Sequence, residues 1–206
     1  MNKPNFDREM QKIISENKKA GVTPSLLLHA CCAPCASACI ERVQEYFDVT
    51  VYYYNPNIDD EREYHKRAAE LERLCGFFGV KLFGEPFGAG EFYKAAAGLE
   101  EQPEGGKRCE KCFYLRLKKT AEKAKAENFD YFSTTLTLSP LKNSELINNI
   151  GNAAGKECGV KFLPSDFKKR GGFLRSVQLC ERLSLYRQNY CGCAFSRGKN
   201  PTGETV

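Results

Sequence analysis

The chain has 206 residues, of which 42% are hydrophobic and 28% are charged, with a formal net charge of +5 and 11 cysteines. This length and composition predict one compact domain with a sizeable core, and they exclude a disordered chain, a collagen-like fibre and a mini-protein. The mild basic excess permits a polyanionic partner but does not require one.

In the first half of the chain, short apolar runs alternate with amphipathic stretches. Residues 25–30 are an apolar run typical of a strand buried on both faces of a parallel sheet, and a helical stretch follows at about 36–47. Residues 49–54 predict a second strand. The acidic residues at 59–61 favour the positive end of a helix dipole, so a helix is expected there, before a short third strand at 80–83.

The second half continues this alternation after a loop-rich segment at about 87–108. The pattern then predicts, in order, a helix at 109–128, a strand at 131–138, a helix at about 144–158, a strand at 160–163 and a helix at about 177–190. Five strands separated by helices predict an α/β fold with a doubly wound, mostly parallel five-stranded sheet. In such sheets ligands bind past the carboxyl ends of the strands.

The cysteines point to a reducing compartment. Their number is odd, so they cannot all pair within the chain, and the first twenty residues contain no apolar secretory segment. No apolar stretch approaches membrane-spanning length, so we expect a cytoplasmic protein with no membrane partner. In the cytoplasm, clustered thiols more often bind metal or exchange electrons than form structural disulfides.

One cysteine pair, Cys109 and Cys112, has the spacing of two thiolates that bind a metal from a single turn. The pair begins a predicted helix, whose dipole stabilises thiolates, but it supplies only half of a metal site. Cys31 and Cys32, in the loop after the first predicted strand, are the obvious source of the other ligands. All-thiolate ligation suits either zinc or an iron–sulfur cluster, and a redox-inert structural zinc stays open.

A second pair, Cys191 and Cys193, places two sulfurs on one side of an extended chain around a glycine. A disulfide between them would be strained and labile, which is typical of thiols that exchange electrons, but the two could equally be further metal ligands. Cys32 and Cys35 form a CxxC motif of the thioredoxin type. The chain length and the other cysteine pairs argue against a thioredoxin-like function. Four isolated cysteines are expected to be small core residues: Cys39, Cys75, Cys158 and Cys180.

Basic runs occur at 66–67, 116–119, 168–170 and 197–199, and such runs are usually solvated faces. The last run lies near three aromatic residues, Tyr186, Tyr190 and Phe195. It could hold a phosphate backbone while a base stacks on a ring, but this signal for RNA is weak by itself.

Six motifs occur in order along the chain: 26–35 (LLLHACCAPC), 54–57 (YNPN), 104–112 (EGGKRCEKC), 134–140 (TTLTLSP), 166–169 (DFKK) and 185–193 (LYRQNYCGC). Together they resemble the cobalamin-independent epoxyqueuosine reductase family, QueH. The resemblance implies a single α/β catalytic domain at 25–196, with the loop-rich insertion at about 87–108. An N-terminal extension at 1–24 and a C-terminal tail at 197–206 lie outside it.

The resemblance also implies an adenine-nucleotide-hydrolase-like (HUP-like) fold in which the cysteine loop replaces a nucleotide loop. The implied reaction is the reduction of the epoxide of epoxyqueuosine in tRNA to queuosine, with a [4Fe–4S] cluster as cofactor. The partners are then a tRNA anticodon loop and an electron donor that the sequence does not identify. Reducing an epoxide to an alkene needs two electrons, whereas one cluster normally passes one electron at a time.

A second redox element would supply the other electron. The cysteines are therefore expected to divide between the cluster and this second element. The expected cluster ligands are Cys31, Cys32, Cys109 and Cys112. Cys191 and Cys193 are expected to form a redox-active pair, and Cys35 could bind an additional mononuclear iron that polarises the epoxide oxygen. The candidate proton donors are Asp166, Lys142, Tyr186 and Tyr190. The alternatives are a zinc-stabilised RNA-binding module and a thioredoxin-like disulfide oxidoreductase.

Overall fold

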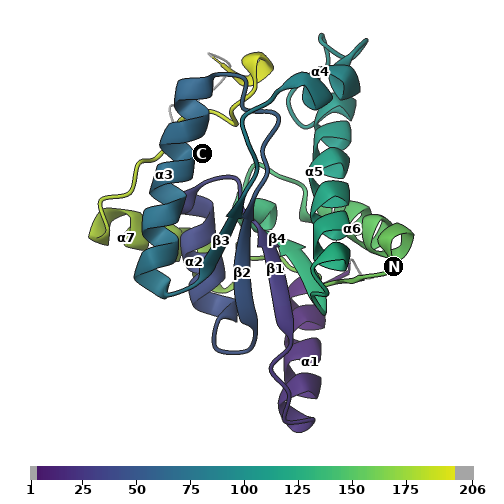
Figure 1. Cartoon of the computed structure of the whole chain (residues 1–206), viewed down its shortest axis with the longest axis vertical. Coiled ribbons are helices and arrows are strands. Elements are labelled where there is room, and N and C mark those ends of the chain that lie inside the picture. The colour runs from purple at the N-terminus through teal and green to yellow at the C-terminus, as the bar shows by residue number, and fades with distance from the viewer. Residues whose placement is uncertain (1–3, 198–206) are drawn as a thin grey trace.

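A five-stranded sheet lies at the centre of the computed structural model, which describes residues 4–197 (Figure 1). The strands are β1 (Ser25–His29), β2 (Asp48–Tyr53), β3 (Lys81–Gly84), β4 (Tyr131–Thr134) and β5 (Lys161–Phe162). Their spatial order is β3-β2-β1-β4-β5, and every neighbouring pair is parallel. The apolar runs of β1 and β2 are buried, as they must be in a parallel sheet covered on both faces. The predicted doubly wound parallel sheet is confirmed.

Helices cover both faces of this sheet. On one side lie α2 (Ala33–Val43), α3 (Glu61–Phe78) and α7 (Gly172–Arg182), and on the other lie α5 (Lys107–Ala126) and α6 (Ser144–Cys158) (Figure 1). The remaining helices are α1 (Phe6–Lys19), α4 (Gly90–Ala96) and the 3-10 helices η1 (Thr135–Leu138), η2 (Lys169–Gly171) and η3 (Ala194–Ser196). Within residues 4–197, no helix is long and apolar enough to cross a membrane.

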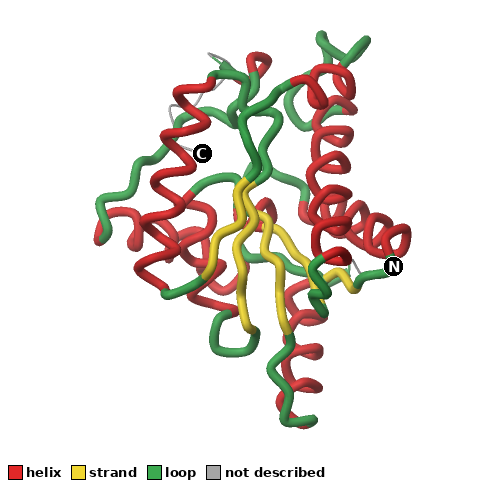
Figure 2. Tube along the Cα trace, in the orientation of Figure 1, coloured by secondary structure: helices red, strands yellow, loops and turns green. Residues whose placement is uncertain are grey.

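The strand order determines where a ligand site forms. β1 is paired with β2 on one side and with β4 on the other, so the connections that follow β1 and β4 diverge. Such a reversal leaves a crevice past the carboxyl ends of the two strands. Loops gather at this end of the sheet in Figure 2, together with α4 and the C-terminal segment that Figure 1 identifies.

Local signals set the bounds of two helices, α3 and α6. Asp60 caps α3, because its carboxylate accepts a hydrogen bond from the backbone N–H of Arg62 at 2.9 Å. The same helix ends at Gly79, whose φ of +67° is the left-handed conformation that favours glycine. The side chain of Asn143 caps the first turn of α6, which has the predicted bounds.

Three predicted elements differ from the observed ones by more than two residues at one end or both. The strand expected at 131–138 ends at Thr134, because the Thr134 hydroxyl accepts a hydrogen bond from the backbone N–H of Leu136 at 3.2 Å and begins η1. The helix expected at 36–47 begins earlier, since a proline suits its first turn, and ends at Val43.

The helix expected at 177–190 also has different bounds. α7 begins five residues earlier and ends at Arg182, where Ser184 takes a φ of +48° that no helix continues through. Residues 183–193 are therefore an irregular segment, and the C-terminal cysteines do not follow the end of a helix as expected.

The expected N-terminal extension contributes to the core, because α1 packs Met10 and Ile14 into it. Asp7 of the same helix forms ion pairs with Arg42 and Arg170. The expected loop-rich insertion contains α4. Apart from Arg197, the expected tail at 197–206 lies outside the described residues, and the domain bounds stay a prediction.

A substitution at Gly151 can test how closely α6 packs against the sheet. A Cβ atom at this position would lie 2.4 Å from Cζ of Phe162 in β5. We expect Gly151→Ala to lower the free energy of unfolding by about 1–3 kcal/mol, because the buried ring must move. Gly76→Ala, inside α3 with nothing within 4 Å of the new Cβ, is the control and should raise it by roughly 0.5–1 kcal/mol. Urea unfolding measures both differences, and an unchanged Gly151→Ala variant would contradict this packing.

Candidate metal centre

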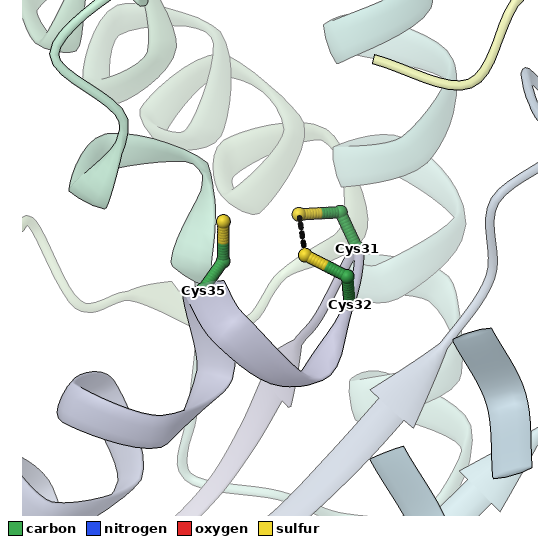
Figure 3. A group of neighbouring side chains, drawn as sticks. All are labelled: Cys31, Cys32 and Cys35. Carbon is green, nitrogen blue, oxygen red and sulfur yellow. Dashed lines mark hydrogen bonds between the residues drawn. The ribbon is translucent and has the colours of Figure 1, made fainter. Parts of the chain in front are cut away.

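Three cysteines between β1 and α2 form a compact group, which we call the trio (Figure 3). The Sγ atoms of Cys31, Cys32 and Cys35 all lie within 4.8 Å of one another, and those of Cys31 and Cys32 are 3.6 Å apart. α2 begins shortly after β1 with Pro34 in its first turn, so Cys35 lies about one turn beyond Cys32 and near it. Three thiols at this spacing suit a shared metal ion.

Hydrogen bonds among the three thiols of the trio shift their pKa values in opposite directions. Hydrogen bonds from the thiols of Cys32 and Cys35 lower the pKa of Cys31 well below its usual range. Burial raises the pKa of Cys32 to about 12, and hydrogen bonds to the other two thiols raise that of Cys35. The trio therefore offers a thiolate, the form of cysteine that binds metals.

The trio lies in the crevice between β1 and β4. Cys31 Sγ is 3.9 Å from Oγ1 of Thr135, which directly follows β4. Gln188, from the irregular segment after α7, donates a hydrogen bond from Nε2 to Cys32 Sγ at 2.8 Å. Segments from three parts of the chain therefore meet at the trio, at the edge where doubly wound sheets bind ligands.

His29, the last residue of β1, has a structural role beside the trio. Its ring nitrogens Nδ1 and Nε2 lie 2.9 Å from Thr134 Oγ1 and 3.1 Å from the carbonyl oxygen of Tyr54. Burial lowers its pKa to about 4, so the ring is neutral at physiological pH. His29 links β1 to β4 and to the loop after β2.

A second group of cysteines lines a cavity near the trio. Its walls include Cys109, Cys112, Cys191 and Cys193, together with Arg116 and Lys142. The cavity measures about 100 Å³, and since about 10–15 Å³ suffices for one water molecule, a ligand of several atoms fits. Burial raises the pKa of both Cys112, to about 12, and Cys109. The expected metal pair and the expected redox pair therefore share one cavity.

Helix α5 presents the first of these pairs from its opening turn. Gly105, with a φ of +84°, donates a hydrogen bond from its backbone N–H to Cys109 Sγ at 3.3 Å. Arg108 is buried and donates to the carbonyl oxygens of Leu99 and Glu100 at 3.2 and 2.8 Å, which fixes the preceding loop. The N–H groups and dipole of the helix start favour thiolates here.

Arg67 of α3 holds the second pair. Its Nη1 and Nη2 donate to the carbonyl oxygens of Cys191 and Tyr190 at 3.1 and 3.3 Å. Its Nε donates to Oε1 of Glu63 at 2.7 Å, and only 1% of Arg67 is exposed. Gly192 has a φ of +122°, and a Cβ atom there would lie 2.8 Å from a buried isoleucine side chain. This bend therefore requires glycine.

Arg116 interacts electrostatically with both cysteine groups. Its Nε donates to the carbonyl oxygen of Cys112 at 3.4 Å, whereas Nη1 and Nη2 have no hydrogen-bond partner within the described chain. Burial by itself lowers the pKa of Arg116, but the interactions with Cys112, Cys191 and Cys31 outweigh it and raise the pKa. A permanent positive charge thus faces the sulfurs from the protein interior.

The expected site residues fall into these two groups. Cys31 and Cys32 lie with Cys35, whereas the other two expected cluster ligands lie with the expected redox pair. Within residues 4–197, the four expected cluster ligands do not form a single group at the 4.8 Å spacing, so their shared ligation of one cluster stays a prediction.

The isolated cysteines Cys39, Cys75 and Cys180 are core residues as predicted, and Cys158 is half-buried.

Two site residues lie in basic runs that were expected to be solvated. Arg67 and Arg116 are both 1% exposed, so that expectation is wrong for them. Helical spacing contained the signal for Arg116, because residues four apart share a helix face and Cys112 is four residues earlier. Gln188 lies within the motif at 185–193, but nothing in that motif predicts its contact with the trio, which depends on the fold of the whole chain.

Arg67 is expected to be the main anchor of the C-terminal cysteine loop. Arg67→Met removes both hydrogen bonds to the loop and leaves the carboxylate of Glu63 without its cation. Breaking a buried ion pair in this way costs about 3–5 kcal/mol of stability. Arg62→Met, an exposed position on the same helix, should change it by less than about 0.5 kcal/mol. Denaturant unfolding measures both, and equal stabilities would rule out the anchoring role.

The chain has close relatives among known proteins. The family model of epoxyqueuosine reductase QueH matches residues 26–199. The chain is 44% identical over 200 residues to the epoxyqueuosine reductase QueH of Streptococcus pyogenes, covering 94% of this chain and 78% of that protein. It is 38% identical over 175 residues to that of Thermotoga maritima, covering 84% and 90%.

A solved structure resembles the fold. The U34-tRNA thiolase NcsA from Methanococcus maripaludis with its [4Fe–4S] cluster superposes with a TM-score of 0.54 at 13% identity, over 93% of this chain and 68% of that chain. At this identity the likeness concerns the fold alone, and it agrees with the expected HUP-like architecture. By its sequence over nearly the whole length, the chain belongs to the epoxyqueuosine reductase QueH family.

Proposed function

We propose that the chain reduces the epoxide of epoxyqueuosine in tRNA to the alkene of queuosine. Family membership supports the reaction. The observation that carries the site is the gathering of two cysteine groups and buried cations at the carboxyl edge of the sheet. The reduction consumes two electrons and two protons for each epoxide and releases the oxygen as water. Electron carriers and a proton donor must therefore meet at this edge.

The proposed cofactor is a [4Fe–4S] cluster held by Cys31, Cys32, Cys109 and Cys112. Buried thiols beside fixed positive charges suit a group of iron and sulfide, since soft thiolate ligands select such metals. The thiolase with the similar fold contains a [4Fe–4S] cluster. When bound, such a cluster supplies electrons one at a time. Cys35 would remain to bind an additional mononuclear iron, which would polarise the epoxide oxygen.

Cys191 and Cys193 are the proposed redox-active pair, which supplies or relays the second electron. Both line the cavity, and Cys191 is half-buried. Oxidation of two thiols to a disulfide releases two electrons and two protons, which alone equals what one epoxide consumes. A pair that only relays the second electron would instead pass on one electron from the external donor and undergo no net oxidation. Arg67 and Gly192 hold the backbone around the pair and thereby keep both sulfurs at the cavity.

Of the four candidate proton donors, Lys142 has the most suitable position, because it lines the cavity. The hydroxyl of Tyr186 donates to a glutamate carboxylate of α3 at 3.0 Å, and Asp166 pairs with a nearby lysine at 3.3 Å. The ring of Tyr190 packs against the guanidinium of Arg67. We therefore assign proton delivery to Lys142, whose ammonium group can reach a ligand in the cavity.

The proposed partners are a tRNA with epoxyqueuosine in its anticodon loop and an electron donor of unknown identity, and the proposed compartment is the cytoplasm. Aromatic rings at the cavity support the nucleic acid. Phe92 lines the cavity and packs against Phe195 with ring centroids 6.2 Å apart. Tyr93 lies 6.4 Å from Phe195 and is 43% exposed. An exposed ring such as that of Tyr93, supported by buried and half-buried rings beside a pocket, suits the stacking of an unpaired base.

Neither alternative function is favoured. A thioredoxin-like exchanger needs only Cys32 and Cys35, yet Cys31 belongs to the same compact group and a second group lies nearby. A zinc-stabilised RNA-binding module would account for the thiols but not for the family to which the chain belongs.

The reaction is tested on tRNA isolated from cells that cannot complete queuosine synthesis. We expect the anaerobically purified, reduced protein to convert epoxyqueuosine in this tRNA to queuosine, as measured by mass analysis of the released nucleosides. The protein should be brown and contain iron and acid-labile sulfide. Unchanged epoxyqueuosine in the presence of an intact cluster and a reductant would refute the activity, and a colourless protein with bound zinc would refute the cofactor.

The roles of the two cysteine pairs are tested by comparing Cys191→Ser with Cys109→Ser. If Cys191 is a redox residue, its variant should retain the iron content and visible spectrum of the parent while losing multiple turnover, by at least about 100-fold. Cys109→Ser should lose iron, because it removes a proposed ligand. Cys158→Ser, at the end of α6, is the control and should match the parent in both measurements. Loss of iron from Cys191→Ser would instead make Cys191 a ligand.

A further inference from the structure

Two buried arginines lie beside the cysteines, and only one of them forms an ion pair with a carboxylate of the described chain. Arg67 and Arg116 are each 1% exposed. Arg67 is paired with the carboxylate of Glu63 at 2.7 Å and donates to two loop carbonyl oxygens. Arg116 forms no ion pair with a carboxylate of the described chain, and its Nη1 and Nη2 have no hydrogen-bond partner there. An unpaired buried charge is strongly unfavourable, so Arg116 requires an anion that no acidic side chain supplies.

The position of Arg116 indicates what this anion is. The side chain lines the same cavity as Cys109, Cys112 and Cys191. It also interacts electrostatically with Cys31 of the trio, so its charge acts on both cysteine groups. Lys142 lines the cavity as well and interacts with Cys191 and Cys31. The groups that act on the charge of Arg116 are therefore cysteines, and the one carboxylate in the cavity wall, that of Glu104, forms no ion pair with it in the described chain.

We propose that Arg116 compensates the negative charge of a thiolate-ligated iron–sulfur group in this cavity and thereby favours its reduced state. The inference rests on the proposed function, since it requires the proposed cluster, which Cys109 and Cys112 of this cavity would hold together with Cys31 and Cys32. A cluster with cysteine thiolates has a net negative charge, and one added electron makes it more negative. A fixed cation in a low-dielectric interior stabilises the more negative state more strongly, which raises the reduction potential.

A phosphate of the RNA substrate is a less suitable anion for Arg116. At 1% exposure, the guanidinium is out of reach of a backbone phosphate at the protein surface. Lys142 is half-buried and can be reached from the cavity, so it is the cation available to a substrate atom. In this proposal the two cations have different partners: Arg116 interacts with the iron–sulfur group, and Lys142 interacts with the substrate.

The test uses the full chain with its cluster assembled under anaerobic conditions. Three variants are compared with the parent: Arg116→Gln removes the charge, Arg116→Lys keeps it, and Lys125→Gln removes an exposed charge from the same helix. The readout is the midpoint potential of the cluster in a dithionite titration followed by electron paramagnetic resonance, with iron and sulfide content measured in parallel. These measurements do not require the tRNA substrate.

We expect Arg116→Gln to decrease the equilibrium constant for one-electron reduction at least tenfold, which corresponds to a potential lower by about 59 mV. Arg116→Lys should stay within about threefold of the parent, and Lys125→Gln should equal it, because an exposed charge is screened by solvent. If Arg116→Gln takes up no cluster while Arg116→Lys does, the positive charge is required for assembly and the proposal is supported.

Two results would overturn the proposal. One is an intact cluster in Arg116→Gln with the parent's potential, which would make the charge irrelevant to the metal group. The other is loss of the cluster from both Arg116 variants, which would assign Arg116 a role in packing. Failure of the proposed function is distinguishable, because it would appear in the parent protein. Unchanged epoxyqueuosine would refute the activity alone, whereas an absence of iron and sulfide would refute the cofactor and this proposal with it. In contrast, a phosphate-binding role for Arg116 would leave the potential unchanged and weaken tRNA binding in Arg116→Gln.

Discussion

The pairing of β1 with β2 on one side and β4 on the other is the constraint on which the site depends. Because the strands are parallel, the connection after β1 and the connection after β4 leave the sheet at the same edge and in different directions. The trio occupies the first connection and contacts the start of the second at Thr135. α5 must run back along the sheet to reach β4, so it begins at this edge and brings Cys109 and Cys112 there. Cysteines distant in sequence thus approach one another through topology alone.

The electrostatic balance of this edge explains why thiols and cations are buried together. Burial raises the pKa of Cys112 and of Cys32 to about 12, so neither thiol ionises easily without a nearby cation. Arg116 is buried without a carboxylate partner in the described chain, which is equally unfavourable. A bound metal–sulfur group would compensate both, since it needs thiolates as ligands and an external positive charge. Metal binding and folding are therefore expected to be coupled at this site.

The elements that could be predicted from the sequence are those with local causes. The apolar run of β1 and the caps at Asp60 and Asn143 are determined by neighbouring residues. The predicted end of β4 is wrong. β-branched threonines favour a longer strand, but the Thr134 hydroxyl accepts a hydrogen bond that begins a 3-10 turn. Local pattern also assigned Arg116 to a solvated run, since a charged residue is rarely fully buried unless it is paired.

The site itself was only partly predictable, and for a different reason. The identity of its cysteines follows from the motifs, but their grouping depends on tertiary contacts. Gln188 reaches Cys32 from a segment 156 residues later in the chain, and Arg67 reaches the carbonyl oxygen of Cys191 across 124 residues. Sequence spacing contains no information on such distances. The structure adds that Cys109 and Cys112 line one cavity with Cys191 and Cys193, and shared ligation of a cluster with Cys31 and Cys32 stays a prediction.

The net charge of +5 does not indicate how many cations are available to bind a nucleic acid, because part of the positive charge is buried. Arg67, Arg108 and Arg116 are each at most 2% exposed, so they cannot bind phosphates at the surface. Arg67 and Arg108 are occupied by a carboxylate or by backbone carbonyl groups, and Arg116 faces the sulfurs. Contacts with a phosphate backbone are therefore expected from lysines and arginines outside the core, whereas the buried arginines lie beside the cysteines of the candidate site and the loops around them. The motifs at 104–112 and 185–193 combine cysteines with residues that fix their backbone, as a redox site of the proposed kind requires, because its ligands must be held in place before the substrate arrives.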